Sequence, residues 1–185
     1  MLCPKLRSLL ALVPILPLLA LGGEPPAVDP MPLYETWIGS WLGALEYRDY
    51  QPPHKRVALP TTLQVTRAPD APALILRFVY DDGPGKTVKS TERLTLDGAA
   101  RRLTWADEGK TPKAGEIFTL AEASSNGDRL VFLGEALDDD KRSRIRYTFT
   151  TTIGSWRIFE ETTSDGPEFA FRHEYRFQKS GGMKK

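Results

Sequence analysis

Alternating apolar and polar residues, repeated in ten short segments, constrain the fold of this chain more than any other feature. The segments are rich in Val, Ile, Thr, Tyr and Phe, and turn signals such as Asp97-Gly98 and Asn126-Gly127 separate them. A period of two residues is typical of β-strands with one buried face, and Asn-Gly and Asp-Gly favour hairpin turns. The predicted strands span residues 41–49, 61–67, 73–80, 87–96, 101–106, 115–122, 129–135, 143–151, 155–163 and 168–178.

The short connections between these segments predict an all-β fold with antiparallel neighbours. Parallel strands need long crossover connections, and no segment after residue 42 has a sustained helical period. An open sheet of ten strands would leave two unprotected edges, which closure into a barrel removes. We therefore predict a single antiparallel up-and-down barrel of eight to ten strands, with a two-sheet β-sandwich as the alternative.

A short helix is predicted directly before the first strand. Tyr34, Trp37, Ile38 and Trp41 follow the spacing i, i+3, i+4 and i+7, which places them on one face of a helix. The four tryptophans of the chain are predicted to be core residues: Trp37, Trp41, Trp105 and Trp156.

Residues 1–22 have the features of a secretory signal peptide. Lys5 and Arg7 precede an apolar run over 9–21, and Ala20-Leu21-Gly22 places small residues at a cleavage site. The run is shorter than the roughly 20 apolar residues of a membrane span. The only cysteine, Cys3, lies inside this segment. We therefore expect a soluble protein exported to the periplasm or the cell exterior, with neither a lipid anchor nor a disulfide.

The rest of the chain divides into three parts. Residues 23–32 are predicted to be a proline-rich linker, residues 33–179 the barrel domain, and residues 180–185 a disordered tail. Because the 25 basic and 24 acidic side chains nearly cancel, giving a net charge of +1, nucleic acid is not an expected partner. No integral membrane span is expected after cleavage of the signal, and the sequence does not indicate the oligomeric state.

The predicted interior of the barrel is not purely apolar. Alternation along 168–178 places Phe169, Phe171, His173, Tyr175 and Phe177 on the inward face. The other strands contribute further inward residues: Tyr47, Tyr80, Val88, Ser90, Glu92, Tyr147 and Glu160. A buried polar group without a partner costs about 1–3 kcal/mol, so this set predicts a cavity that holds water or a ligand. The candidate ligand-binding residues are His173, Tyr175, Glu92, Tyr47, Tyr80, Tyr147 and Glu160.

Two short motifs resemble those of the calycin barrels. Gly39-Ser40-Trp41 resembles the Gly-x-Trp signature of lipocalins and their relatives, at the start of the first strand. His173 and Tyr175 are similar to the Arg-x-Tyr pair with which fatty-acid-binding proteins hold a carboxylate, although His replaces Arg here. Nitrobindin-type haem barrels also open with Gly-x-Trp and carry a late histidine. The resemblance implies a ligand-binding barrel and, for the nitrobindin type, His173 as the axial ligand of a haem.

Three hypotheses for function follow. The first is an exported, lipocalin-like protein that binds a small, largely apolar molecule in the barrel without catalysis. The second is a haem-binding barrel with His173 as ligand, and the third is a solid barrel whose exterior binds another protein. Glu92 and Glu160 could act as an acid–base pair, but no complete catalytic set is present. No other metal or cofactor is predicted, because His54 and His173 lie on a loop and a strand and form no ligand cluster.

Overall fold

The computed structural model describes residues 29–49, 52–113, 116–138, 141–164 and 166–181. The predicted signal peptide, residues 23–28 of the predicted linker and residues 182–185 of the predicted tail lie outside these ranges. The helix α1 spans Pro30–Trp37, so the last three residues of the predicted linker belong to it.

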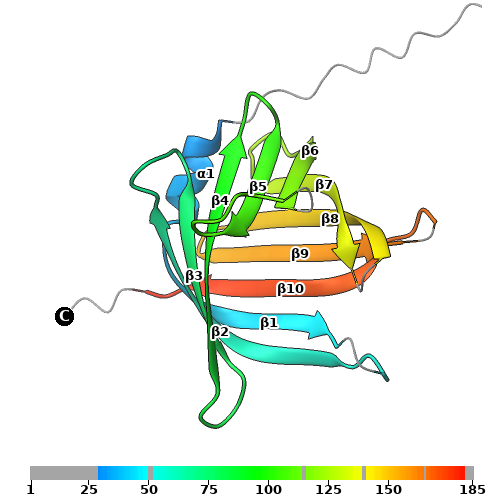
Figure 1. The fold of residues 1–185 in the computed structure, drawn as a ribbon. Coiled ribbons are helices and arrows are strands. Elements are labelled where there is room, and N and C mark those ends of the chain that lie inside the picture. The colour runs from blue at the N-terminus through cyan, green and yellow to red at the C-terminus, as the bar shows by residue number, and fades with distance from the viewer. Residues whose placement is uncertain (1–28, 50–51, 114–115, 139–140, 165, 182–185) are drawn as a thin grey trace, which may run out of the picture.

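Ten antiparallel strands form one closed barrel (Figure 1). Each strand pairs with its neighbours in sequence, and β1 pairs with β10 to close the ring. The strands are β1 (Gly39–Arg48), β2 (Arg56–Arg67), β3 (Leu74–Asp81), β4 (Thr87–Asp97), β5 (Arg102–Asp107), β6 (Ile117–Ala123), β7 (Arg129–Asp138), β8 (Lys141–Thr152), β9 (Ser155–Thr163) and β10 (Ala170–Lys179). The predicted up-and-down barrel with a helix before its first strand is therefore confirmed, and the two-sheet sandwich is excluded.

The largest difference in strand boundaries concerns β2, which begins at Arg56 rather than at residue 61. Val57 and Leu59 continue the alternation and are partly buried, whereas Pro60 is exposed. Pairing with β3 starts only at Thr61. Pro60 therefore lies at an edge position on that side, where a residue without an N–H group is tolerated in a strand.

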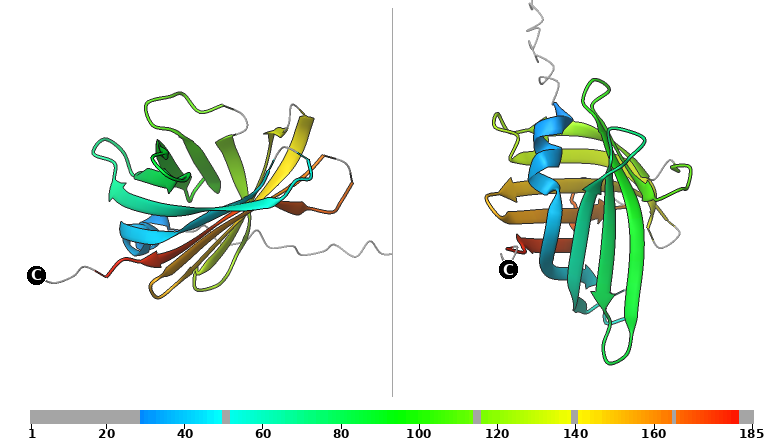
Figure 2. Two further views of the ribbon diagram at one scale, coloured as in Figure 1. Left: turned by 90° about the horizontal axis from the view of Figure 1, so that it is seen from below. Right: turned by 90° about the vertical axis from the view of Figure 1, so that its left-hand side faces the viewer.

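The helix α1 lies across one end of the barrel (Figure 2), and its aromatic side chains belong to the core. Trp37 is 1% exposed, stacks on Trp156 at a centroid distance of 5.0 Å, and donates from Nε1 to the Thr151 hydroxyl at 2.8 Å. Trp41 lies in β1 rather than in the helix, and its indole donates to the Trp37 carbonyl at 2.8 Å. Below, this α1-covered end is called the closed end.

A bulge in β10 changes the faces of two phenylalanines. The register of β10 on β9 shifts between Phe171 and His173. Phe171 therefore packs on Phe159 at 5.9 Å, beneath the guanidinium of Arg56 at 3.9 Å. Phe169 lies outside β10, under Arg146 at 4.4 Å. The prediction that Phe169 and Phe171 face the interior was wrong, because a bulge adds one residue and so reverses the alternation beyond it.

Val88 lies on the inward face, as predicted, because it is the register partner of the buried Tyr80. It is nevertheless 47% exposed. The hairpin between β3 and β4 extends beyond the rest of the barrel, at the bottom of Figure 1, so the residues near its tip have no opposite wall to pack against. Leu94 and Leu96, further along the same strand, are buried as predicted.

Candidate functional site

The polar inward residues gather at the end of the barrel opposite α1, here called the open end. Tyr47 lies beside His173, His173 beside Glu160, and Glu160 beside Tyr147, each pair in register on neighbouring strands. Residues directly opposite in antiparallel strands have Cβ atoms about 4.5–5.5 Å apart. The four side chains thus form one row across β1, β10, β9 and β8.

Glu160 holds the middle of this row together. The Tyr147 hydroxyl donates to Glu160 Oε2, and His173 Nδ1 lies 3.2 Å from the same oxygen. The Glu160 side chain is 8% exposed and that of His173 24%. Burial, followed by the nearby charge of Glu160, raises the pKa of Tyr147 well above its usual value. Tyr147 therefore stays a neutral hydrogen-bond donor at physiological pH.

Tyr80 and Tyr175 form a second buried polar contact. Their hydroxyl oxygens are 3.0 Å apart, and Tyr175 is 7% exposed. Burial raises the pKa of both phenols, that of Tyr175 well above its usual value. The two hydroxyls satisfy each other, which explains how the interior tolerates them.

Glu92, on β4, accepts hydrogen bonds from side chains of β4 and β5. Its Oε1 accepts from the Ser90 hydroxyl at 2.8 Å, and its Oε2 accepts from Trp105 Nε1 at 2.6 Å. Burial raises the pKa of the Glu92 carboxyl, while these two hydrogen bonds lower it. Burial has the larger effect on this pKa. It raises the pKa because it disfavours the charged form of the carboxyl group.

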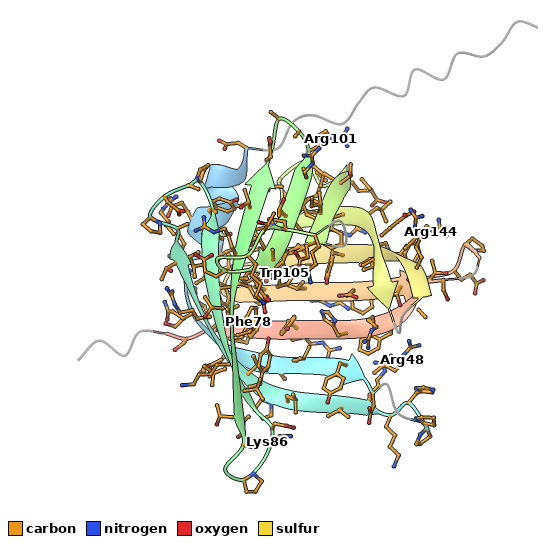
Figure 3. The ribbon with its side chains drawn as sticks, viewed as in Figure 1. Arg48, Phe78, Lys86, Arg101, Trp105 and Arg144 are labelled. Carbon is orange, nitrogen blue, oxygen red and sulfur yellow. The ribbon has the colours of Figure 1, made fainter. Side chains whose placement is uncertain are left out.

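These groups surround a pocket of about 280 Å³ at the open end. Its lining is Glu92, Trp105, Ala106, Asp107, Glu116, Phe118, Tyr147, His173 and Tyr175. The aromatic walls pack on one another: Tyr147 lies 5.5 Å from Trp105 and 5.0 Å from Phe118, centroid to centroid. Figure 3 shows Trp105 toward the middle of the barrel, whereas Lys86 lies at the tip of the β3–β4 hairpin.

The structure brings four of the seven predicted site residues to the pocket surface: Glu92, Tyr147, His173 and Tyr175. Glu160 and Tyr80 lie behind it, in hydrogen-bond contact with Tyr147 and Tyr175 respectively. Tyr47 is in the row with His173 but does not line the pocket.

Sequence reasoning missed five lining residues: Trp105, Ala106, Asp107, Glu116 and Phe118. Trp105 was predicted to be a core residue, and it does contact the core cluster while also forming a pocket wall. A usable signal was present. Leu103, Trp105 and Asp107 share one face by alternation, and Asp107 ends its strand at the open end.

The described residues contain no group of three or more His, Cys, Asp or Glu side chains able to hold a metal ion. Over the same ranges, no helix has the length and apolar character needed to cross a membrane.

Comparison with known proteins gives a fold neighbour but no family. No protein-family model matches the chain, and no curated protein matches it. Among solved structures, the chain is similar to an S-type phycobiliprotein lyase from Guillardia theta, with a TM-score of 0.54 and 10% identity. The match covers 85% of this chain and 95% of the lyase. The two proteins share their fold, which in this chain is a closed antiparallel barrel. At this identity the likeness concerns the fold alone.

Proposed function

We propose that the protein is an exported, non-enzymatic barrel that binds a small, largely apolar molecule in the pocket at its open end. The observation that carries the proposal is the pocket itself, in which the rings of Trp105, Phe118, Tyr147 and Tyr175 meet a few directed polar groups. Ligand sites in proteins commonly combine apolar walls with a small number of polar groups that fix orientation. The similar fold of a phycobiliprotein lyase is compatible with this proposal.

Packing restricts the ligand to the open half of the barrel. The closed half is filled by side chains that are almost completely buried, among them Trp37, Trp156, Phe149 and Phe177. At about 280 Å³, the pocket is slightly smaller than the roughly 300–1,000 Å³ of sites for drug-sized ligands. A compact ligand of one or two rings fits this space better than a long lipid. The pocket also favours a binding function over a solid, purely structural barrel.

Haem is the second candidate ligand, and one observation favours it. Glu160 Oε2 lies 3.2 Å from His173 Nδ1, and a carboxylate at the second nitrogen orients many metal-bound histidines. Overall the residues present fit haem poorly. Glu92, Asp107 and Glu116 line the pocket and would repel the two negatively charged propionates of haem. A Soret band in protein incubated with haemin, lost in His173→Ala, would establish this alternative.

The test of the main proposal is a fluorescence titration of the purified protein with N-phenyl-1-naphthylamine, a neutral apolar probe. We expect a saturable rise in emission with one probe per chain, because the pocket excludes water from the naphthyl ring. The proposal fails if neither this probe nor any neutral, cationic or anionic naphthyl compound binds saturably.

Two neighbouring residues of β6 provide a matched pair of variants. Phe118 is 3% exposed and lines the pocket, whereas Ile117 is 37% exposed and does not line it. Phe118→Ala removes a wall of the site and should weaken probe binding about tenfold, since burying an aromatic side chain contributes about 1.5–3 kcal/mol. Ile117→Ala should leave probe binding unchanged. Circular dichroism checks that both variants are folded.

A further inference from the structure

Glu92 is an inward carboxylate without a basic partner in the described part of the chain. Its side-chain hydrogen bonds come from the neutral groups of Ser90 and Trp105, and no lysine or arginine of the described residues forms an ion pair with it. A carboxylate can accept about four hydrogen bonds. Two acceptor positions of Glu92 are thus unused, and the residue lines the pocket.

The surroundings of Glu92 add negative charge. Asp107 is its direct partner in the register of β4 and β5 and also lines the pocket. Asp107 pairs with the exposed Lys110, and Glu116 accepts from the backbone N–H of Lys113 at 2.8 Å. Asp107 is thus paired with a lysine, whereas the hydrogen bonds to Glu92 and Glu116 come from neutral groups.

The pocket walls favour a positive charge as well. The faces of aromatic rings attract cations, with Trp the most effective, and the attraction is stronger where water is excluded. Trp105, Tyr147 and Phe118 all line the pocket. The indole N–H of Trp105 is the group that holds Glu92, so the carboxylate and the best ring for a cation are adjacent.

We propose that the ligand is an organic cation: a compact aromatic or aliphatic amine whose ammonium group lies between Glu92 and the ring of Trp105. This inference rests on the proposed binding function and names the class of ligand that the site takes. An ammonium group donates hydrogen bonds to the unused acceptor positions of Glu92, and hydrogen bonds between charged groups are stronger than neutral ones. The apolar part of the amine then lies against Phe118 and Tyr147.

Other charged ligands fit these residues less well. An anion would meet Glu92, Asp107 and Glu116 in a partly desolvated site, where like charges repel most strongly. Calcium takes six to eight oxygen ligands, and the described residues hold no side-chain group suited to a metal. An organic cation needs only one carboxylate and aromatic surface, both of which are present.

The test uses three naphthalene compounds that differ only in their polar group: 2-naphthylmethylammonium, 2-naphthylmethanol and 2-naphthoate. Equilibrium dialysis at pH 7.5 measures the affinity of the full exported protein for each. We expect the ammonium compound to bind at least about tenfold more tightly than the alcohol, since a hydrogen bond to a charged group contributes about 1.5–3 kcal/mol. The carboxylate compound should bind most weakly.

The variant Glu92→Gln keeps the shape of the side chain and removes its charge. It should lower the affinity for the ammonium compound about tenfold and leave the affinity for the alcohol almost unchanged. Glu122→Gln removes the same charge from a side chain that is 64% exposed and does not line the pocket, and it should change neither affinity. Equal binding of ammonium and alcohol by the unmodified protein would overturn the inference while leaving the proposed function intact. Absence of binding by all three compounds would overturn the inference, and absence of binding by N-phenyl-1-naphthylamine as well would overturn both.

Discussion

At the scale of single residues, Glu92 is the side chain at which stability and function are most opposed. Taking a carboxylate out of water disfavours its charged form, and the hydrogen bonds from Ser90 and Trp105 offset only part of that cost. An apolar residue at this position would avoid the cost. The proposed binding role accounts for its presence, because strongly perturbed ionisable groups gather at functional sites.

The pH dependence of stability follows from this environment. The pKa of Glu92 is raised in the folded protein above its ordinary value of 4.5, so the folded state binds more protons than the unfolded state between the two values. The free energy of unfolding therefore falls as pH rises through that window. Glu92→Gln lacks the titrating group. We expect its stability relative to the unmodified protein to increase as pH rises from below 4.5 towards 7.

Urea unfolding at a series of pH values measures this difference. Glu122→Gln, at an exposed position, provides the control and should show no such trend. A difference between Glu92→Gln and the unmodified protein that stays constant with pH, or that decreases as pH rises, would contradict the assigned environment of Glu92.

Alternation alone predicted that five of the site residues face inward, but it did not predict their hydrogen-bond partners. These residues are Glu92, Tyr147, Glu160, His173 and Tyr175. The contacts of Glu160 with Tyr147 and His173 depend on the register between β8, β9 and β10. Register comes from loop geometry and packing, which no local sequence pattern reports. For the same reason, the hydrogen bond from Trp105 to Glu92 was not predicted, although a single turn joins their two strands.

At the scale of elements, closure of the barrel depends on a close approach of β1 and β10 at Gly43. A Cβ atom at this position would lie 1.9 Å from the Arg176 carbonyl oxygen, a distance that forces the backbone to move. We expect Gly43→Ala to lower the free energy of unfolding by about 3 kcal/mol or more. Leu42→Ala, at a neighbouring side chain that is 55% exposed, should change it by only about 0.5 kcal/mol or less. Equal effects in denaturant titrations would contradict the close approach.

The helix α1 is expected to be an integral part of the core despite its eight residues. Trp37→Ala removes the stacking on Trp156 and the hydrogen bond to Thr151, and it should cost about 3–5 kcal/mol. Glu35→Ala, which removes an exposed ion pair with Arg67, should cost at most about 1 kcal/mol. Thermal and urea unfolding measure both. A small effect of Trp37→Ala would mean that α1 packs only loosely on the barrel.

The number and direction of the elements were predictable because each strand carries its own alternation and each turn its own residues. The bulge in β10 was not. The segment 168–178 alternates without interruption in sequence, and the extra residue, Arg172, becomes visible only through the register of β10 on its partner strand β9. A single inserted residue in the ladder therefore reversed the faces of Phe169 and Phe171 without leaving a local signal.

At the scale of the whole molecule, the barrel interior is divided between its two ends. The closed end is an aromatic core under α1, and the open end holds the polar row and the pocket. Because of this division, substitutions at the closed end should mainly lower the stability of the fold, and substitutions at the open end should mainly change ligand affinity. The sequence predicted both apolar and polar inward residues, but their distribution follows from strand direction and register, which place the end of β5 beside Glu92 in the middle of β4.

Export is the remaining prediction for the whole chain. The expected signal peptide of residues 1–22 should be removed, so the protein recovered from the producing organism should begin at Gly23. Cell fractionation, intact mass measurement and N-terminal sequencing test this prediction together. Full-length chain confined to the cytoplasm would contradict it.

The most direct test of the central claim uses the indole N–H resonances of the four tryptophans. Trp105 lines the pocket, whereas Trp37, Trp41 and Trp156 are each 1% exposed in the core. In a two-dimensional ¹H–¹⁵N spectrum, titration with 2-naphthylmethylammonium should shift the Trp105 indole resonance in a saturable way and leave the other three in place. A Trp105 signal that does not move at saturating ligand, or a shift confined to the three core tryptophans, would contradict a binding site at the open end.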